Sequence, residues 1–230
     1  MAGSISPELL SALALLPTCT VANAIELLDT RLRNVGFTNS TIHCCFPEFS
    51  PLVGYAVTLR LHGANPPMEG GLYVQSNEWW DELSRFPEPR ILVIEDADRR
   101  PGTAAFIGET HAAILQALGC VAAITNGAVR DVDQVAKLGF QLFSGATSVS
   151  HAYAHVARVE GPVTVGGLTI ASGDLLHGDR HGVVKVPPEG VERIIEIASK
   201  LRHQEREIVR YCKSDKFSRE GLQELLRKLA

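Results

Sequence analysis

The sequence lacks the long hydrophobic run of a membrane-spanning helix, since none of its apolar stretches approaches about 20 residues. Its first ten residues, MAGSISPELL, lack a basic segment followed by an apolar stretch, so we expect no signal peptide. Basic residues are not in excess either: 22 Lys and Arg against 26 Asp and Glu give a formal net charge of −4. This balance argues against nucleic acid or an anionic membrane as the main partner.

Cysteine is also scarce. The five cysteines are odd in number and have no disulfide-framework spacing, so we expect free thiols and a cytoplasmic location. What remains is typical of a soluble globular protein: 45% hydrophobic and 21% charged residues in a chain of 230. We find no internal repeat, low-complexity segment or linker, and we therefore predict a single domain over residues 1–230.

Helical and strand-like segments alternate along most of the chain, and short β runs follow between Val156 and Val186. This pattern predicts an α/β fold with an added antiparallel portion. The first predicted helix begins at Ser6–Pro7, and the last is capped by Ser218. The predicted helices between them cover Thr20–Leu32, Trp79–Phe86, 108–118, Asp131–Leu138 and Glu189–Lys213. The predicted strands cover Leu52–Leu61, Arg90–Glu95, 120–125 and Phe140–Ser144.

The most informative segment is the predicted helix at 108–118 together with the strand at 120–125 and the loop that ends in Arg130 and Asp131. If the strand packs back along the helix, the helix start and the end of the strand lie at the same edge. The unpaired N–H groups of the helix start would then face Arg130 and Asp131. Backbone donors, a guanidinium and one carboxylate suit a small carboxylate substrate held beside a hard divalent cation.

The same residues, GETHAAILQALGCVAAITNGAVRD at 108–131, resemble the signature of the class II 4-hydroxy-4-methyl-2-oxoglutarate aldolases and the related regulator of ribonuclease activity A proteins. SGDLL at 172–176 and HGVVKVP at 181–187 are similar to later strands of that family, and the likeness runs from about Thr18 to Ala198. It implies a three-layer β/β/α swivelling fold in homotrimers or homohexamers. It also implies magnesium or manganese, cleavage of a 4-hydroxy-2-oxo acid to pyruvate and a second oxo acid, and accompanying oxaloacetate decarboxylation.

The resemblance further implies roles for individual residues. Backbone groups of Gly108, Glu109, Thr110 and His111 would bind the carboxylate of the substrate. Arg130 would hold the oxygen that becomes the enolate, and Asp131 would ligate the metal. In the family, a C-terminal acidic residue of a neighbouring subunit reaches toward the metal waters. We therefore expect residues 189–230 to form a helical arm that crosses to the next protomer, with Glu205 and Glu207 as the candidates.

Three positions differ from the pattern of the aldolases. Gln134 stands where an acidic residue is usual, Asn126 stands where Asp is frequent, and His111 replaces an apolar residue. These differences bear on substrate and turnover rather than on fold or metal. They leave open a second function, a non-catalytic protein that binds a large partner as the ribonuclease regulators do.

Other interpretations of individual residues also stay open. Arg130 and Asp131 alone are compatible with a surface ion pair at a helix start. The pairs His151/His155 and His177/His181 have i, i+4 spacing, but neither has the Glu of a zinc-protease helix, so we do not expect a zinc site. Asp96 and Asp98 precede two arginines and are expected in a solvated loop at the end of a strand.

Overall fold

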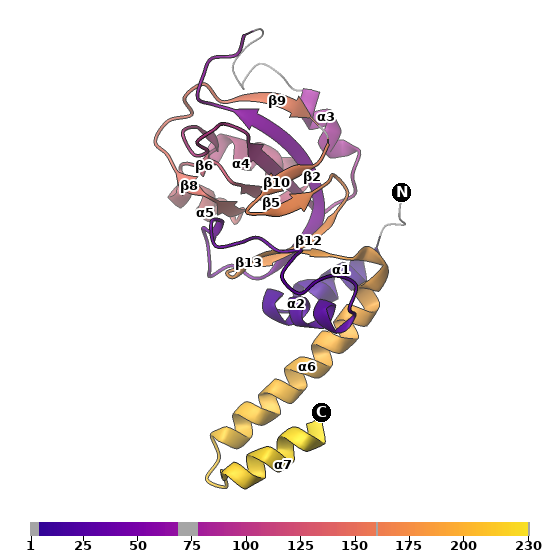
Figure 1. Ribbon diagram of the computed structural model, residues 1–230. Helices are drawn as coiled ribbons and strands as arrows, with labels where there is room; N and C mark the ends of the chain where they lie inside the picture. The colour runs from indigo at the N-terminus through magenta and orange to yellow at the C-terminus, as the bar shows by residue number, and fades with distance from the viewer. Residues whose placement is uncertain (1–4, 69–77, 160, 230) are drawn as a thin grey trace.

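The computed structural model describes residues 5–68, 78–159 and 161–229. Its centre is an eight-stranded mixed sheet in the order β1-β7-β5-β3-β2-β12-β13, with β9 also paired to β2 (Figure 1). The strands are β1 His43–Cys44, β2 Leu52–His62, β3 Arg90–Asp96, β5 Cys120–Thr125, β7 Gln141–Ser144, β9 His155–Val159, β12 Leu175–Asp179 and β13 Gly182–Val186.

The long strand β2 joins two parts of this sheet. It runs parallel to β3 along one edge, while its other edge pairs antiparallel with β12 at its start and with β9 at its end. Its sequence, LVGYAVTLRLH, buries nearly every side chain, as expected for a strand covered on both faces. The predicted strand at Leu52–Leu61 is therefore confirmed.

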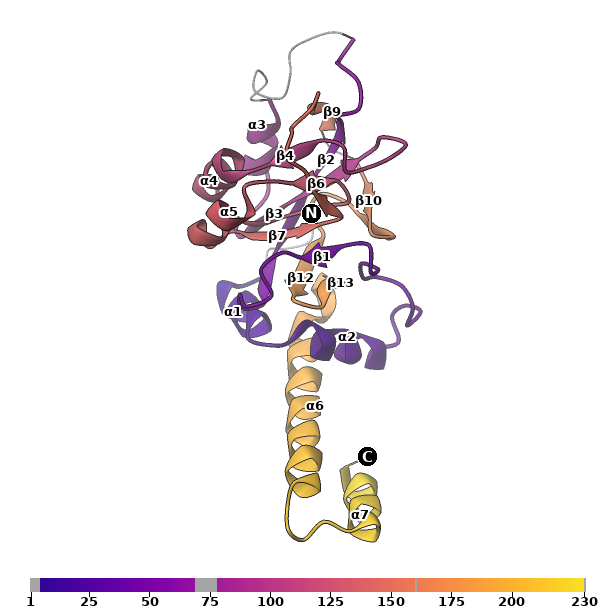
Figure 2. The ribbon, with the colours of Figure 1, turned by 90° about the vertical axis from the view of Figure 1, so that its left-hand side faces the viewer.

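Three layers are built on the parallel strands. In β3, alternation sends Leu92 and Ile94 into a core cluster with α4 and α5, whereas Ile91 and Val93 pack on the opposite face. Figure 2 shows α3, α4 and α5 on one side of the sheet and β10 on the other. The bounds of these elements are α3 Glu78–Ser84, α4 Glu109–Ala117, α5 Val132–Leu138, β10 Val163–Val165 and β11 Leu168–Ile170. The expected β/β/α arrangement is confirmed.

A second, three-stranded parallel sheet was not predicted. It consists of β4 Ala105–Ile107, β6 Ala128–Val129 and β8 Ala146–Thr147 in the order β4-β6-β8. Because the carboxyl ends of parallel strands share one edge, Gly108, Arg130 and Ser148 follow their strands to the same side. Strands of two or three residues are too short to give a periodic pattern, so the sequence alone indicates loops in this region.

The N-terminal helices and the start of the long C-terminal helix pack together beneath the sheet. The elements of these two chain segments are α1 Pro7–Ala14, α2 Thr18–Leu27, the 3-10 turn η2 Pro188–Gly190, α6 Val191–Cys212 and α7 Arg219–Leu229. The first half of α6 packs Ile194 and Ala198 against α1 and α2. Its second half projects from the body as an arm, and α7 lies alongside its far end (Figure 1). No residue of α7 that the structure describes is buried.

The start of α1 follows its predicted cap, whereas α2 begins at Thr18, two residues before the predicted Thr20. Ser6 caps α1, since its side chain accepts a hydrogen bond from the Leu9 N–H at 3.3 Å. The prediction of a helix over Thr20–Leu32 was wrong at its end, because Asp29 adopts a left-handed φ of 51° that stops α2. Within the described ranges no single helix is long and apolar enough to cross a membrane. Only α1 and α2 taken together have the length and apolar composition of a membrane span, and the two helices are bent by 111° relative to each other.

Candidate functional site

The start of α4 lies against the residues that follow β6. Gly108 is the N-cap of α4, and the N–H of Glu109 donates a hydrogen bond to Oδ2 of Asp131 at 3.2 Å. A Cβ on Gly108 would lie 2.4 Å from that oxygen and 3.0 Å from Cγ of Arg130. A side chain at position 108 would therefore displace the Asp131 carboxylate and the Arg130 side chain, and the expected juxtaposition of helix start and Arg130–Asp131 loop is present.

Asp131 has an uncommon backbone conformation. It is the N-cap of α5 with φ 52° and ψ 38°, a left-handed geometry that Asp and Asn tolerate better than most residues. Such a conformation stores on the order of 1–3 kcal/mol and is concentrated at functional sites. The α5 helix starts at Val132 instead of the predicted Asp131, because Asp131 has this non-helical conformation.

The Arg130–Asp131 contact is weak as an ion pair. Nε of Arg130 donates to Oδ2 of Asp131 at 3.3 Å, and the two side chains are 36% and 38% exposed. An exposed pair of this kind stabilises a fold by roughly 0–1 kcal/mol at most. Stability therefore does not explain why the two residues are held together. The backbone of Arg130 is fixed more firmly, since its N–H donates to the Ile107 carbonyl at 2.9 Å.

An open pocket of about 420 Å³ lies beside this pair. It is lined by Val129, Arg130, Asp131, Val132, Thr147, Ser148 and Val149. The residues from Thr147 to Val149 were not predicted as part of the site, because they belong to the short strand β8 and the segment that follows it. The sheet register brings them there, since Val129 pairs with Thr147 and the Ser148 N–H donates to the Val129 carbonyl at 3.0 Å.

Thr110 and His111 continue the first turn of α4, where helical N–H groups have no intrahelical acceptor. Thr110 is exposed, whereas the His111 ring stacks on Phe106 with centroids 4.8 Å apart and lies 6.5 Å from the ring of Trp79. Burial, and then the positive charge of Arg130, lower the pKa of His111. The ring is therefore neutral at pH 7. It packs against aromatic side chains, as an apolar residue would at this position.

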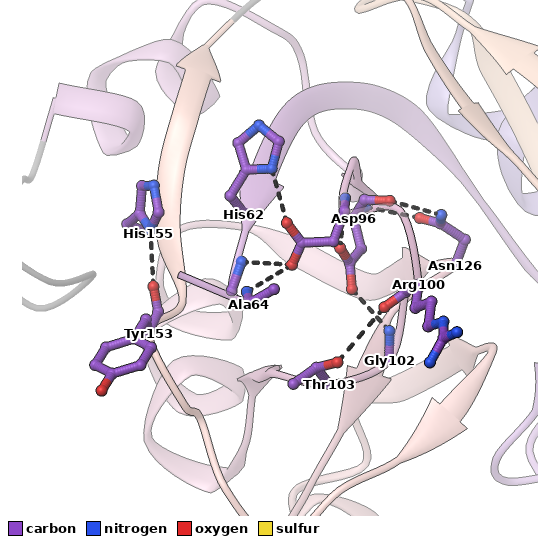
Figure 3. A network of polar contacts seen from close by, with 11 residues as sticks. His62, Ala64, Asp96, Arg100, Gly102, Thr103, Asn126, Tyr153 and His155 are labelled. Atoms are coloured by element: carbon purple, nitrogen blue, oxygen red, sulfur yellow. Dashed lines mark hydrogen bonds and ion pairs between the residues drawn. The ribbon is translucent and has the colours of Figure 1, made fainter. Parts of the chain in front are cut away.

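Asn126 and Asp96 form a hydrogen-bonded network and do not line the pocket. The Asn126 side chain accepts from the Asp96 N–H at 2.8 Å and donates to the Asp96 carbonyl at 2.9 Å (Figure 3). The Asp96 carboxylate accepts from the N–H groups of Asp98 and Gly102. Burial raises the pKa of Asp96 despite these bonds. The prediction of a solvated loop was wrong for Asp96, which is 2% exposed because these hydrogen bonds satisfy it inside the fold.

The other residues considered as candidates lie outside the pocket. Gln134 and Asp133 are exposed on the first turn of α5. His177 is fully buried, with its nitrogens bonded to Thr18 Oγ1 and the Leu13 carbonyl, so it is not a metal ligand. Across the described part of the chain, no group of three or more His, Cys, Asp and Glu side chains is arranged to hold a metal. All five cysteines are free thiols, as expected.

The fold and the sequence together define the class of protein. The family model described as RraA-like, Aldolase/RraA, matches residues 18–185. The chain belongs to this family, which includes 4-hydroxy-4-methyl-2-oxoglutarate aldolases and regulators of ribonucleases.

Individual relatives agree with that assignment. Over 113 residues the chain is 29% identical to a Halalkalibacterium halodurans protein named "Putative 4-hydroxy-4-methyl-2-oxoglutarate aldolase", covering 49% of this chain and 53% of that protein. The chain thus spans about half the length of this curated relative. Among solved structures, an uncharacterised Pseudomonas syringae protein has a TM-score of 0.74 at 20% identity, covering 99% and 97% of the two chains. Streptomyces coelicolor RraAS2, of the RNase ES inhibitor RraA protein family, has a TM-score of 0.67 at 20% identity, covering 90% and 97%. These two structures support the fold.

Proposed function

We propose that this chain is a divalent-metal-dependent lyase. Its substrate would be a 4-hydroxy-2-oxo acid of the 4-hydroxy-4-methyl-2-oxoglutarate type, cleaved to pyruvate and a second oxo acid, with decarboxylation of oxaloacetate as a related activity. The observation that carries this proposal is the contact of the α4 start with Arg130 and Asp131 beside an open pocket. A surface ion pair has no need of a glycine-lined helix start or a strained Asp.

The donor set fits a hard cation. Magnesium keeps several waters and takes only one or two protein carboxylates together with oxygens of the substrate. Asp131 is the carboxylate that would ligate Mg²⁺ or Mn²⁺, and the exposed Glu109 lies directly beside it. When bound, such an ion supplies Lewis-acid stabilisation of negative charge on the keto and carboxylate oxygens of the substrate.

The residues of the chain then have separate tasks. The N–H groups at the α4 start, from Gly108 to His111, would receive the carboxylate of the substrate. Cleavage of the C3–C4 bond follows transfer of the 4-hydroxyl proton to a water molecule that would act as the base, and it leaves an electron pair on the pyruvate fragment as an enolate, to which the same water would return a proton. Arg130 would lie against the oxygen that gains this charge, and protonation at C3 would complete pyruvate. One such electrostatic contact is commonly worth about 3–4 kcal/mol of barrier.

We further propose that the active form is a homotrimer or homohexamer. The pocket beside Asp131 is open, and the second half of α6 projects away from its own domain with Glu205 and Glu207 on it (Figure 2). An arm that crosses to the next protomer would bring an acidic side chain to the exposed side of the pocket. Glu207 lies 3.8 Å from both His203 and Arg210, and Glu205 is exposed.

The test is pyruvate release from 4-hydroxy-4-methyl-2-oxoglutarate and from oxaloacetate, with magnesium, with manganese and with a chelator. We expect turnover that disappears on chelation and returns with either ion. Asp131→Ala should lose this turnover, and Asp133→Ala is its matched control. Asp133 is exposed, lies two residues further along the chain in α5 and does not line the pocket. No pyruvate from either substrate with any divalent ion would overturn the proposal.

The second candidate is a non-catalytic protein that binds a ribonuclease. Gln134 favours it, because an acidic residue is usual at this position in the aldolases that the sequence resembles, and the Streptomyces relative is named as a ribonuclease inhibitor family member. Inhibition of a ribonuclease by the purified chain, combined with absent lyase activity, would establish this alternative.

A further inference from the structure

Two histidines lie directly opposite each other on neighbouring strands, far along the chain from the helix start that forms the pocket. His62 ends β2 and His155 begins β9, and the antiparallel register pairs the two residues. Side chains of directly opposed residues lie on the same face of a sheet. The two imidazole rings accordingly have centroids 6.1 Å apart at an interplanar angle of 38°.

Each ring is held through the same nitrogen. Nδ1 of His62 is 2.9 Å from Oδ1 of Asp98, and Nδ1 of His155 is 2.7 Å from the Tyr153 carbonyl (Figure 3). An ionised carboxylate and a carbonyl only accept hydrogen bonds, so each Nδ1 carries the proton and donates it. In the neutral rings, Nε2 then presents its lone pair. Within the described residues neither Nε2 takes part in a hydrogen bond, and both side chains are partly exposed.

The partner of His62 is itself fixed. Oδ2 of Asp98 accepts the N–H groups of Gly63 at 2.8 Å and Ala64 at 2.7 Å. Metal-binding histidines commonly have a charged carboxylate behind Nδ1, because it fixes the tautomer and the orientation of the ring.

We propose that His62 and His155 bind one transition-metal ion of the zinc, nickel or copper class through their Nε2 atoms. Imidazole nitrogens suit these ions, whereas the oxygen donors at Asp131 suit magnesium. Two metal–nitrogen bonds of about 2.0–2.1 Å each, with the ring centres lying behind the nitrogens, can span the 6.1 Å between the two ring centroids. No third side chain completes the set among the described residues, so water or a small ligand would take the remaining positions.

The site would link the last residue of β2 to the first residue of β9. An ion bound only in the folded state stabilises that state by mass action. The metal would therefore hold together a pairing of strands that are far apart in the chain, at a place where the β2–β9 register is already interrupted between Arg60 and Leu61.

The experiment titrates zinc into the tag-free full-length chain with ¹⁵N-labelled histidine, in excess magnesium so that the Asp131 site is occupied. We expect one-to-one binding at micromolar zinc, with shifts of the Nε2 resonances of His62 and His155. His62→Gln and His155→Gln should each remove this binding, and Asp98→Asn should weaken it by about 10- to 100-fold. His43→Gln is the matched control, an exposed histidine on another strand that should leave binding unchanged.

Thermal unfolding without metal checks that each variant is folded. No binding up to millimolar zinc, or zinc shifts confined to other histidines, would overturn the proposal. So would equal zinc affinity in the wild type and in folded His62→Gln and His155→Gln chains. Since the readout is metal binding and not pyruvate release, its failure is separate from failure of the lyase proposal.

Discussion

Two aspartates at the carboxyl ends of strands have opposite environments. Asp96 ends β3, is 2% exposed and has its carboxylate, N–H and carbonyl all in hydrogen bonds of 2.8–3.1 Å. Asp131 follows β6 in a left-handed backbone conformation, its side chain is 38% exposed, and its carboxylate receives only longer contacts of 3.2 and 3.3 Å.

The difference separates a structural carboxylate from a reactive one. A buried carboxylate with every group satisfied stabilises a loop, and removing its partners leaves unpaired polar groups at a cost of about 1–3 kcal/mol each. An exposed carboxylate in a strained conformation adds little stability, and its oxygens are accessible to an incoming ligand. Substitutions in the two regions should therefore separate loss of activity from loss of stability.

The largest effect on activity is expected from Asp131→Ala. This change removes the proposed metal ligand and relieves a contact that contributes little to folding. Metal-dependent pyruvate release should fall to background while the thermal unfolding temperature falls only modestly, because alanine tolerates the left-handed conformation of this position less well than aspartate. Unchanged turnover with added magnesium would show that Asp131 is not the ligand.

Arg130→Lys should have the next largest effect. Lysine keeps the positive charge but not the planar fork that matches two oxygens. If Arg130 stabilises the enolate oxygen, kcat should fall by about 100- to 1,000-fold, with Arg99→Lys on an exposed loop as the control. A rise in KM at constant kcat would instead mean that Arg130 binds the ground state.

The long helices and strands were predictable from sequence because they have a periodic hydrophobic pattern and capping residues or glycines at their ends. The approach of the α4 start to Arg130–Asp131 was predictable for the same reason. β2, β3, β5 and α4 have close to their predicted bounds for this reason. The short strands β4, β6 and β8 were not predictable, since two or three residues have no period and their pairing is a tertiary effect. The aromatic packing of His111 depends on Phe106 and Trp79, and the side-chain hydrogen bonds of Asn126 depend on Asp96. Local sequence pattern does not reveal such tertiary partners.

Truncation after Lys200 tests whether the open region around Asp131 is completed by another chain. It removes α7 and the exposed part of α6 but keeps Ile194 and Ala198, which pack on α1 and α2. The mass in light scattering and the activity should therefore both fall, while the remaining domain stays folded. A fully active monomer would rule out the crossing arm.

The smallest effect on activity is expected from Asn126→Asp, which introduces the residue that is frequent in the aldolases that the sequence resembles. The Asn126 amide donates to the Asp96 carbonyl, and an ionised carboxylate has no proton to donate. The change also places a negative charge beside the buried Asp96, so we expect a loss of about 1–3 kcal/mol of unfolding free energy at neutral pH. The loss should shrink in acid, because the introduced carboxyl group can donate a hydrogen bond once it is protonated.

Denaturant unfolding at two pH values measures this effect, and Asn39→Asp is the control. The Asn39 side-chain oxygen only accepts hydrogen bonds, from the N–H and hydroxyl of Thr41, so an aspartate there keeps the same role. Pyruvate release per folded molecule should change little in Asn126→Asp, because the Asn126 amide bonds to Asp96 and does not line the pocket. A large gain in turnover without loss of stability would mean that position 126 acts on the metal site after all, and that the separation between the two aspartates is incomplete.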